Sequence, residues 1–124
     1  MSDTFSQKHH PVEIRLIRET KTLEVDFKDG PTVALPAELL RVESPSADVQ
    51  GHGPSQKKTI AGRRHVGIMG VEAVGNYAVR IKFDDMHDTG IFTWDYLYDM
   101  GMRKDEMWTG YLADLAAKGL SRDP

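Results

Sequence analysis

Hydrophobic and polar residues alternate in two stretches near the start of the chain. Residues 12–16 read VEIRL and residues 23–28 read LEVDFK, so every second side chain is apolar. A period of two places the apolar side chains on one face of a β-strand. Residues 29–31 (DGP) form a turn signal, after which residues 32–35 can return as a further strand. This part of the chain therefore predicts three strands, the first two joined through residues 18–22.

The same alternation returns in the second half of the chain. A fourth strand is predicted over residues 66–71, and Gly75-Asn76 is a two-residue hairpin turn signal. In residues 77–83 (YAVRIKF), the apolar side chains face one side of a strand and two basic side chains face the other. Residues 91–92 continue the sheet after an acidic loop.

Helical signals occupy one central segment and the C-terminal part of the chain. Residues 36–41 (PAELLR) predict a short helix, because proline is suited to a first turn. Thr93 can cap a second helix, which Gly101 would end. Asp105 can cap a third helix, whose apolar residues recur at the i, i+3, i+4, i+7 spacing and which Gly119 would end.

These elements predict an α+β fold, with an antiparallel β-sheet of about five or six strands and C-terminal helices packed on one face. We expect a flexible leader at residues 1–11 and a single domain at residues 12–120. Within it, residues 44–62 form a long polar loop with three glycines, two prolines and no periodicity. A loop of that length in a compact domain is usually functional or disordered.

Composition excludes several classes of function. The 124 residues suffice for one core, and 40% hydrophobic and 28% charged residues are ordinary globular values. A formal net charge of -3 gives no reason to expect a general binder of polyanions. The chain has no cysteine, which excludes disulfides, thiolate nucleophiles and Cys-ligated zinc. No apolar run approaches membrane-spanning length and no secretory signal is recognisable, so we expect a cytoplasmic protein.

Four segments carry a family resemblance in their order and spacing. They read LEVDFKDG at residues 23–30, LLRVESP at 39–45, VGNYAV at 74–79 and DDMHDTGIFTW at 84–94. Together they span about residues 11–112, and they resemble the γ-butyrobetaine hydroxylase-like N-terminal domain family. The resemblance implies a stand-alone bacterial protein of unknown function. Related domains are fused to a Mrp-type iron–sulfur carrier ATPase, or precede the oxygenase domain of 2-oxoglutarate-dependent carnitine-pathway hydroxylases.

Two departures limit what the resemblance implies. In the hydroxylase branch a Cys cluster and a later histidine hold a structural zinc; His87 matches that histidine, but residues 43–48 (ESPSAD) offer no thiolate. Met86 stands where the family usually has glycine, so a turn that favours positive φ must adapt. We expect no iron-binding oxygenase domain here, and hydroxylase activity is therefore not implied.

Asp84, Asp85, His87 and Asp88 lie within one short loop. Carboxylate oxygens and an imidazole suit a divalent metal, so iron or zinc bound through His87 is one interpretation. The alternative is a solvated hairpin loop whose Asp side chains cap turns. No other cofactor is predicted, and no catalytic residue is assigned.

The same loop is also part of a predicted binding surface. Arg41, residues 84–88 and Trp94 would form this surface, with the long loop closing over it. His87 would then hydrogen-bond Asp95 or Arg41 and orient the start of the second helix. With an ordinary pKa near ~6.5, it could also titrate around neutrality.

One basic cluster flanks the long loop. It consists of Lys57, Lys58, Arg63, Arg64 and His65. Nucleic-acid binding would use such charges, but no aromatic residue is interleaved to stack bases and the whole chain is acidic. We therefore predict a solvated, mobile loop and no nucleic-acid partner.

The leading functional interpretation is a non-enzymatic accessory or interaction module with a protein partner. By analogy with the fused relatives, that partner would be an iron–sulfur carrier or a metalloprotein. The alternative is an iron- or zinc-binding protein that uses His87 and neighbouring Asp. A small hydrolase or isomerase ranks last, because the sequence shows no nucleophile–base pair. The oligomeric state stays open, since an edge strand such as residues 32–35 can pair between chains.

Overall fold

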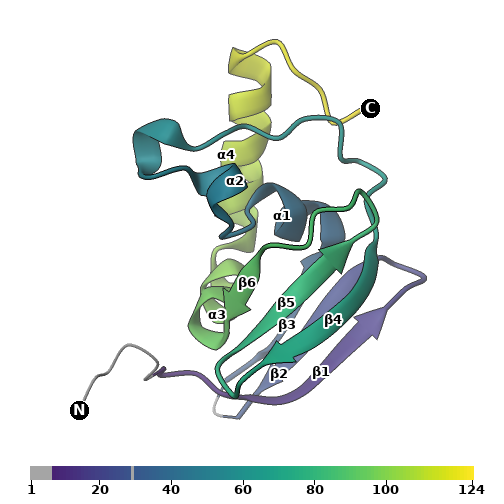
Figure 1. Cartoon of the computed structure of the whole chain (residues 1–124), viewed down its shortest axis with the longest axis vertical. Coiled ribbons are helices and arrows are strands. Elements are labelled where there is room, and N and C mark those ends of the chain that lie inside the picture. Colours follow the sequence, from purple (N-terminus) through teal and green to yellow (C-terminus); the bar gives the residue numbers. More distant parts are fainter. Residues whose placement is uncertain (1–6, 29) are drawn as a thin grey trace.

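Two three-stranded antiparallel sheets form the β part of the computed structural model, which describes residues 7–28 and 30–124 (Figure 1). One sheet has the order β1-β2-β3 and the other has the order β4-β5-β6. The strands are β1 (Pro11–Ile17), β2 (Thr22–Phe27), β3 (Thr32–Pro36), β4 (Ile68–Val74), β5 (Ala78–Phe83) and β6 (Ile91–Thr93). The number of strands and their antiparallel arrangement were predicted correctly, although the fourth strand lies at residues 68–74 and was predicted at 66–71.

The prediction of one sheet of five or six strands is wrong, because the six strands form two separate sheets. β1 and β4 are neighbouring edge strands, but within the described residues no backbone ladder joins them. The guanidinium of Arg18 instead donates hydrogen bonds to the carbonyl oxygens of Ile68 (3.1 Å) and Met69 (3.2 Å). At this end of β4 a side chain, and no backbone ladder, connects the two sheets within the described residues.

The helices lie at one end of the two sheets (Figure 1). They are α1 (Ala37–Val42), α2 (Ala47–Gln50), the 3-10 turn η1 (Pro54–Gln56), α3 (Trp94–Met102) and α4 (Lys104–Ala117). α3 packs against β3 and β6, whereas α4 extends away from the sheets alongside α1 and α2. Among the described residues, no helix has the length and apolar composition needed to cross a membrane.

The main hydrophobic core lies between the inner faces of the two sheets, α1 and α3. The alternating residues of β2 and β5 point into it, as the period of two predicts. Its fully buried members include Leu23, Val25, Leu35, Leu39, Leu40, Ile81, Phe92, Leu97 and Met100. A smaller core joins α1 to α4 through Val42, Tyr111 and Leu115, with Ile60 packed against it.

Two of the four ends predicted for the C-terminal helices are confirmed. The Thr93 hydroxyl accepts a hydrogen bond from the backbone N–H of Tyr96, and caps α3. Gly119 has a φ of 65° and follows α4, where the Leu120 N–H bonds to the Leu115 carbonyl. Asp105 does not cap α4, because the helix begins one residue earlier, at Lys104. Gly101 does not end α3.

The long loop predicted at residues 44–62 contains regular structure. Ser46 caps the single-turn helix α2 by accepting the backbone N–H of Asp48, and the Val49 side chain is buried. The Lys58 N–H bonds to the Val49 carbonyl at 2.7 Å, and this closes the segment on itself. A short helix without a periodic apolar face leaves no signal in the sequence pattern.

Part of the predicted leader packs on the start of α3. Residues 1–6 lie outside the described residues. Gln7 donates to the Tyr77 carbonyl (2.7 Å) and accepts from the Asp95 N–H (2.7 Å). The Asp95 carboxylate accepts the backbone N–H groups of Lys8 and His9. Asp95 therefore holds the chain just before β1, and it is not a partner of His87.

Gly101 is required by packing. A Cβ atom added at Gly101 would lie 2.3 Å from Cγ1 of Val33 on β3, a distance that real Cβ contacts do not show. At Gly110 in α4, no heavy atom lies within 4 Å of such a Cβ. α3 can approach β3 this closely only because residue 101 has no side chain.

We expect Gly101→Ala to lower the free energy of unfolding by about 1–3 kcal/mol, because the added methyl group overpacks the contact. Gly110→Ala is the matched control. It should raise stability by about 0.5–1 kcal/mol, the usual gain for alanine over glycine inside a helix. Urea unfolding of both variants measures this, and a stabilising Gly101→Ala would contradict the close packing of α3 on β3.

Candidate functional site

The loop between β5 and β6 is held by its own backbone. The Phe83 N–H bonds to the His87 carbonyl (3.0 Å), and the Met86 N–H bonds to the Phe83 carbonyl (3.2 Å). Met86 has a φ of 73°, although its side chain is 83% exposed and gains little from packing. The turn thus keeps the positive φ that favours glycine, and a residue with a Cβ adopts it at some cost.

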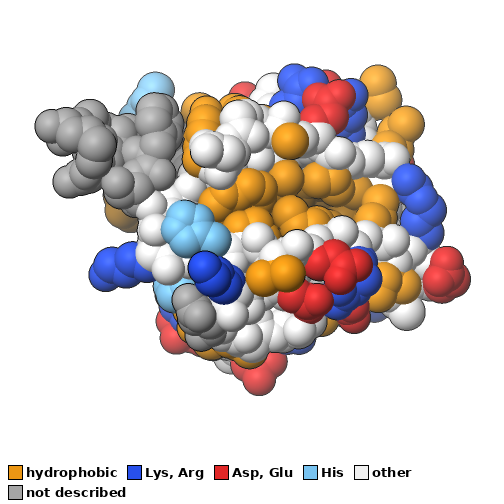
Figure 2. All heavy atoms as spheres, turned by 90° about the horizontal axis from the view of Figure 1, so that it is seen from below, with side chains coloured by type: hydrophobic (Ala, Val, Ile, Leu, Met, Phe, Trp, Pro, Cys, Tyr) orange, Lys and Arg blue, Asp and Glu red, His pale blue; other side chains and the backbone are white. Residues whose placement is uncertain are grey.

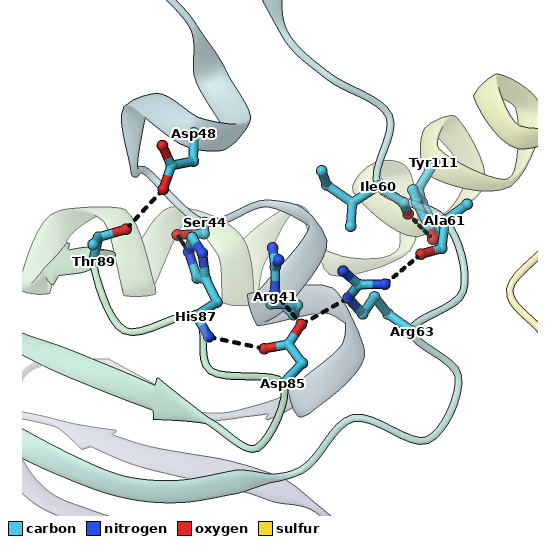
Figure 3. A network of polar contacts seen from close by, with 10 residues as sticks. All are labelled: Arg41, Ser44, Asp48, Ile60, Ala61, Arg63, Asp85, His87, Thr89 and Tyr111. Atoms are coloured by element: carbon cyan, nitrogen blue, oxygen red, sulfur yellow. Dashed lines mark hydrogen bonds and ion pairs between the residues drawn. The ribbon is translucent and has the colours of Figure 1, made fainter. Parts of the chain in front are cut away.

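The Asp85 carboxylate is the centre of the polar network in Figure 3. Its Oδ2 atom accepts the Nε–H of Arg41 from α1 and the Nε–H of Arg63 from the segment before β4, both at 2.7 Å. Its Oδ1 atom accepts the backbone N–H of His87 at 3.1 Å. One carboxylate therefore joins α1, the residues before β4 and the β5–β6 loop.

The charged neighbours of Asp85 lower the pKa of its carboxyl group. Burial raises the pKa of Asp85, but the hydrogen bonds from Arg41, the His87 N–H and Arg63 outweigh burial and hold that pKa below its ordinary value. The Arg41 side chain is only 9% exposed. Its Nη1 is buried with no hydrogen-bond partner in the described residues, so Asp85 is the anion that compensates its charge.

His87 belongs to a second part of the same network. Its Nε2 and the Ser44 Oγ are 2.9 Å apart, and the Ser44 side chain is fully buried. Burial and the charge of Arg41 lower the pKa of His87 below its ordinary value, against the opposing charges of Asp85, Asp48 and Asp88. These surroundings therefore favour the neutral imidazole.

Hydroxyl groups connect the β5–β6 loop to α2. Ser46 Oγ and Thr89 Oγ1 share a hydrogen bond of 2.7 Å, and Thr89 also donates to Asp48 at 3.4 Å. The backbone of Gly90 passes so close to Ser44 that a Cβ at residue 90 would lie 2.3 Å from the Ser44 Oγ. These contacts fix the first part of the long loop on the β5–β6 loop.

The structure brings together only part of the predicted binding surface. Arg41, Asp85 and His87 form the network, whereas the Asp84 and Asp88 side chains are exposed and do not join it. Trp94 lies at the opposite end of β5, where its Nε1–H donates to the Asn76 carbonyl at 2.8 Å. The structure does not bring Trp94 to the network, because antiparallel β6 carries the chain back past β5 before α3 begins.

Sequence reasoning missed Ser44 and Arg63. Ser44 lies in the segment that resembles the family, but a serine carries little pattern of its own. Arg63 was assigned to a solvated basic cluster, and its side chain is 32% exposed, yet its guanidinium binds Asp85. Their neighbours along the chain carry no signal of either contact, because both contacts join distant parts of the sequence.

The Ser44–His87 pair resembles a nucleophile with its base, but it lacks two requirements of one. Ser44 is fully buried and cannot reach a substrate. No hydrogen bond in the described residues orients the other ring nitrogen of His87. The pair acts as a structural contact between the long loop and the β5–β6 loop.

A comparison with known proteins now places the chain. The family model described as γ-butyrobetaine hydroxylase-like, N-terminal, matches residues 14–98. The chain belongs to this family. No curated protein matches it.

Solved structures agree with this family. One NMR solution structure is 50% identical, with a TM-score of 0.82, and the match covers 94% of this chain and 91% of that one. A second NMR solution structure is 40% identical, with a TM-score of 0.83, and the match covers 100% of this chain and 92% of that one. A crystal structure from Acidithiobacillus ferrooxidans ATCC 23270 is 41% identical, with a TM-score of 0.63 and coverage of 81% and 98%. It is described as a DUF971-family protein of unknown function.

The zinc that the family resemblance implies does not fit these residues. The segment after α1 offers the Ser44 hydroxyl in place of a thiolate, and that hydroxyl is hydrogen-bonded to His87 Nε2. Among the residues that the structure describes, no group of three His, Asp or Glu side chains is arranged to hold a metal ion.

We expect acid to destabilise the fold through His87 first. The folded-state pKa of His87 lies below the unfolded value of about 6.5, so the unfolded chain takes up a proton more readily. Stability should fall as the pH drops below about 6.5, until the folded pKa is passed. Asp85, whose folded pKa is also lowered, adds a further loss at more acidic pH.

His87→Gln tests this. Glutamine stays neutral, so the variant should lose less stability than the wild type between pH 7.5 and 5.5. The measurement is urea unfolding of both proteins at the two pH values. Equal losses would show that His87 does not link protonation to folding.

Proposed function

We propose that this protein is a non-enzymatic accessory module that binds another protein. The observation that carries the proposal is an open groove between the edge strands β1 and β4, with a volume of about 520 Å³ and mostly apolar side chains in its lining. Ile14 and Leu16 line it from β1, and Val71 and Ala73 line it from β4. Apolar side chains gathered along an open groove are a common feature of binding sites.

Figure 2 supports this view of the surface. On the face seen from below, hydrophobic side chains form a band, with mixed clusters of acidic and basic side chains on both sides of it. The clusters on the outer faces of the sheets are internally paired: Arg15 with Glu24 and Asp26, and Glu72 with Arg80. The charged clusters are therefore satisfied within the protein and need no partner. The apolar band between them is the surface that a partner would cover.

The predicted site around Asp85 supports the proposal in another way. Asp85 accepts three internal hydrogen bonds, and His87 Nε2 is paired with a buried serine. These side chains hold the fold and leave little capacity for a substrate or a metal. No observation favours the metal-binding or hydrolase interpretation over an interaction module.

The family resemblance supports a choice of partner by analogy. Related domains fused to an iron–sulfur carrier ATPase point to an iron–sulfur carrier or another metalloprotein as the partner. The proposed setting is the cytoplasm, in keeping with a chain that has no cysteine.

Ala73→Arg tests the proposal, because Ala73 is exposed and lines the groove, so a long cation there blocks it without opening the core. Ala113→Arg makes the same change on the exposed face of α4 and is the control. Purified wild type and Ala113→Arg should each crosslink the same protein from the native cell extract, and Ala73→Arg should recover at least tenfold less.

The identity and metal content of the captured protein then decide its class. A partner without a metal or cluster would remove the analogy with iron–sulfur carriers. Equal recovery by Ala73→Arg, or no partner for the wild type, would contradict the interaction module at this groove.

A further inference from the structure

We infer that the groove takes an extended segment of its partner, which adds as a strand to the edge of β1 and places an acidic group on Arg18. This inference rests on the proposed function and specifies the chemistry of the partner. Two observations carry it. One is the free edge of β1, and the other is a cation without a carboxylate at one end of the groove.

The edge of β1 has the features that strand addition needs. β1 pairs with β2 on one side only, and within the described residues no strand occupies its other side. A bulge between Pro11 and Glu13 disturbs the start of the strand, but residues 13–17 are in regular register with β2. Such an edge offers backbone donors and acceptors to an incoming strand.

β4 is the less suitable edge. Arg18 already occupies the carbonyl oxygens of Ile68 and Met69, and the register of β4 shifts between Ile68 and Gly70. We therefore expect the partner strand to pair with β1 and not with β4. An added strand would place alternate side chains over the apolar floor, where Leu23 and Val79 lie at the base of the groove.

Arg18 supplies the second recognition element. It lines the groove, its guanidinium is fixed by two backbone carbonyls, and no carboxylate in the described residues forms an ion pair with it. By contrast, Arg15 on the outer face is paired with three acidic side chains. A positioned arginine with free N–H groups suits an Asp or Glu side chain or a terminal carboxylate.

These features define the occupant. It is an extended segment of about five to seven residues, a usual strand length, with alternate apolar side chains. One end carries an acidic group. Its outward side chains are polar, because they lie between the charged clusters that flank the band in Figure 2.

The test is a selection of random heptapeptides displayed with free C-termini on the immobilised wild-type protein, with Ala73→Arg for counter-selection. We expect enriched peptides to alternate apolar and polar residues and to carry an acidic group at one end. Arg18→Gln should weaken the binding of the enriched peptides about tenfold, the loss expected for one hydrogen bond to a charged group. Arg103→Gln, on an exposed helix end, is the control and should change binding less than twofold.

Amide hydrogen exchange locates the added strand. Bound peptide should slow exchange of the amides of residues 13–17 more than those of β4. Enriched peptides without acidic groups, or binding unchanged by Arg18→Gln, would overturn the role of Arg18. Protection confined to β4, or no enrichment at all, would overturn strand addition at β1.

The two proposals fail separately. If peptides are not enriched but crosslinking still depends on Ala73, the partner presents a folded surface to the groove, and only the strand-addition inference falls. If neither experiment finds a groove-dependent ligand, the proposed function falls as well.

Discussion

The pairing of Asp85 with two arginines is the constraint on which the arrangement of the non-strand segments depends. Arg41 reaches Asp85 from α1, and Arg63 reaches it from the residues before β4. Removing a buried guanidinium from water is costly unless a charged acceptor faces it, and the carboxylate supplies that acceptor. The β5–β6 loop must therefore hold Asp85 in one position, and its backbone bonds and the positive φ of Met86 serve that position.

A second set of contacts extends this constraint to the long loop. Ser44 bonds to His87, and Ser46 bonds to Thr89, so the chain after α1 is fixed on the same β5–β6 loop. The polar groups around Asp85 are thereby largely taken up by internal contacts, although the Arg63 side chain stays 32% exposed. The groove between β1 and β4 has no comparable set of internal contacts, apart from Arg18 at one end. This contrast is why the proposed binding surface lies at the groove and not at the polar network.

The sequence predicts those parts of the fold that repeat with a regular period. β2 and β5 each have one buried face and β1 has a partly buried one, so alternation locates these strands. Alternation cannot say which edges pair, and one sheet was expected where two form. Gly101 was assigned as a helix end on local grounds, whereas its role is set by Val33 on a distant strand. In the candidate site, Arg41, Asp85 and His87 were predicted together, while Ser44 and Arg63 were missed because single polar residues have no period. Trp94 follows the acidic loop closely in the sequence, but antiparallel β6 takes the chain to the other end of β5 before Trp94 is reached.

The most direct test of this account is the free energy of unfolding of Asp85→Asn at pH 7, measured against Asp88→Asn. Asparagine keeps the shape of the side chain but removes the charge that compensates Arg41 and Arg63. The account predicts a loss of about 2–4 kcal/mol for Asp85→Asn, as for other broken ion pairs that are largely buried. A change within about 0.5 kcal/mol is expected for the exposed Asp88. Equal small changes in both variants would contradict the central role of Asp85.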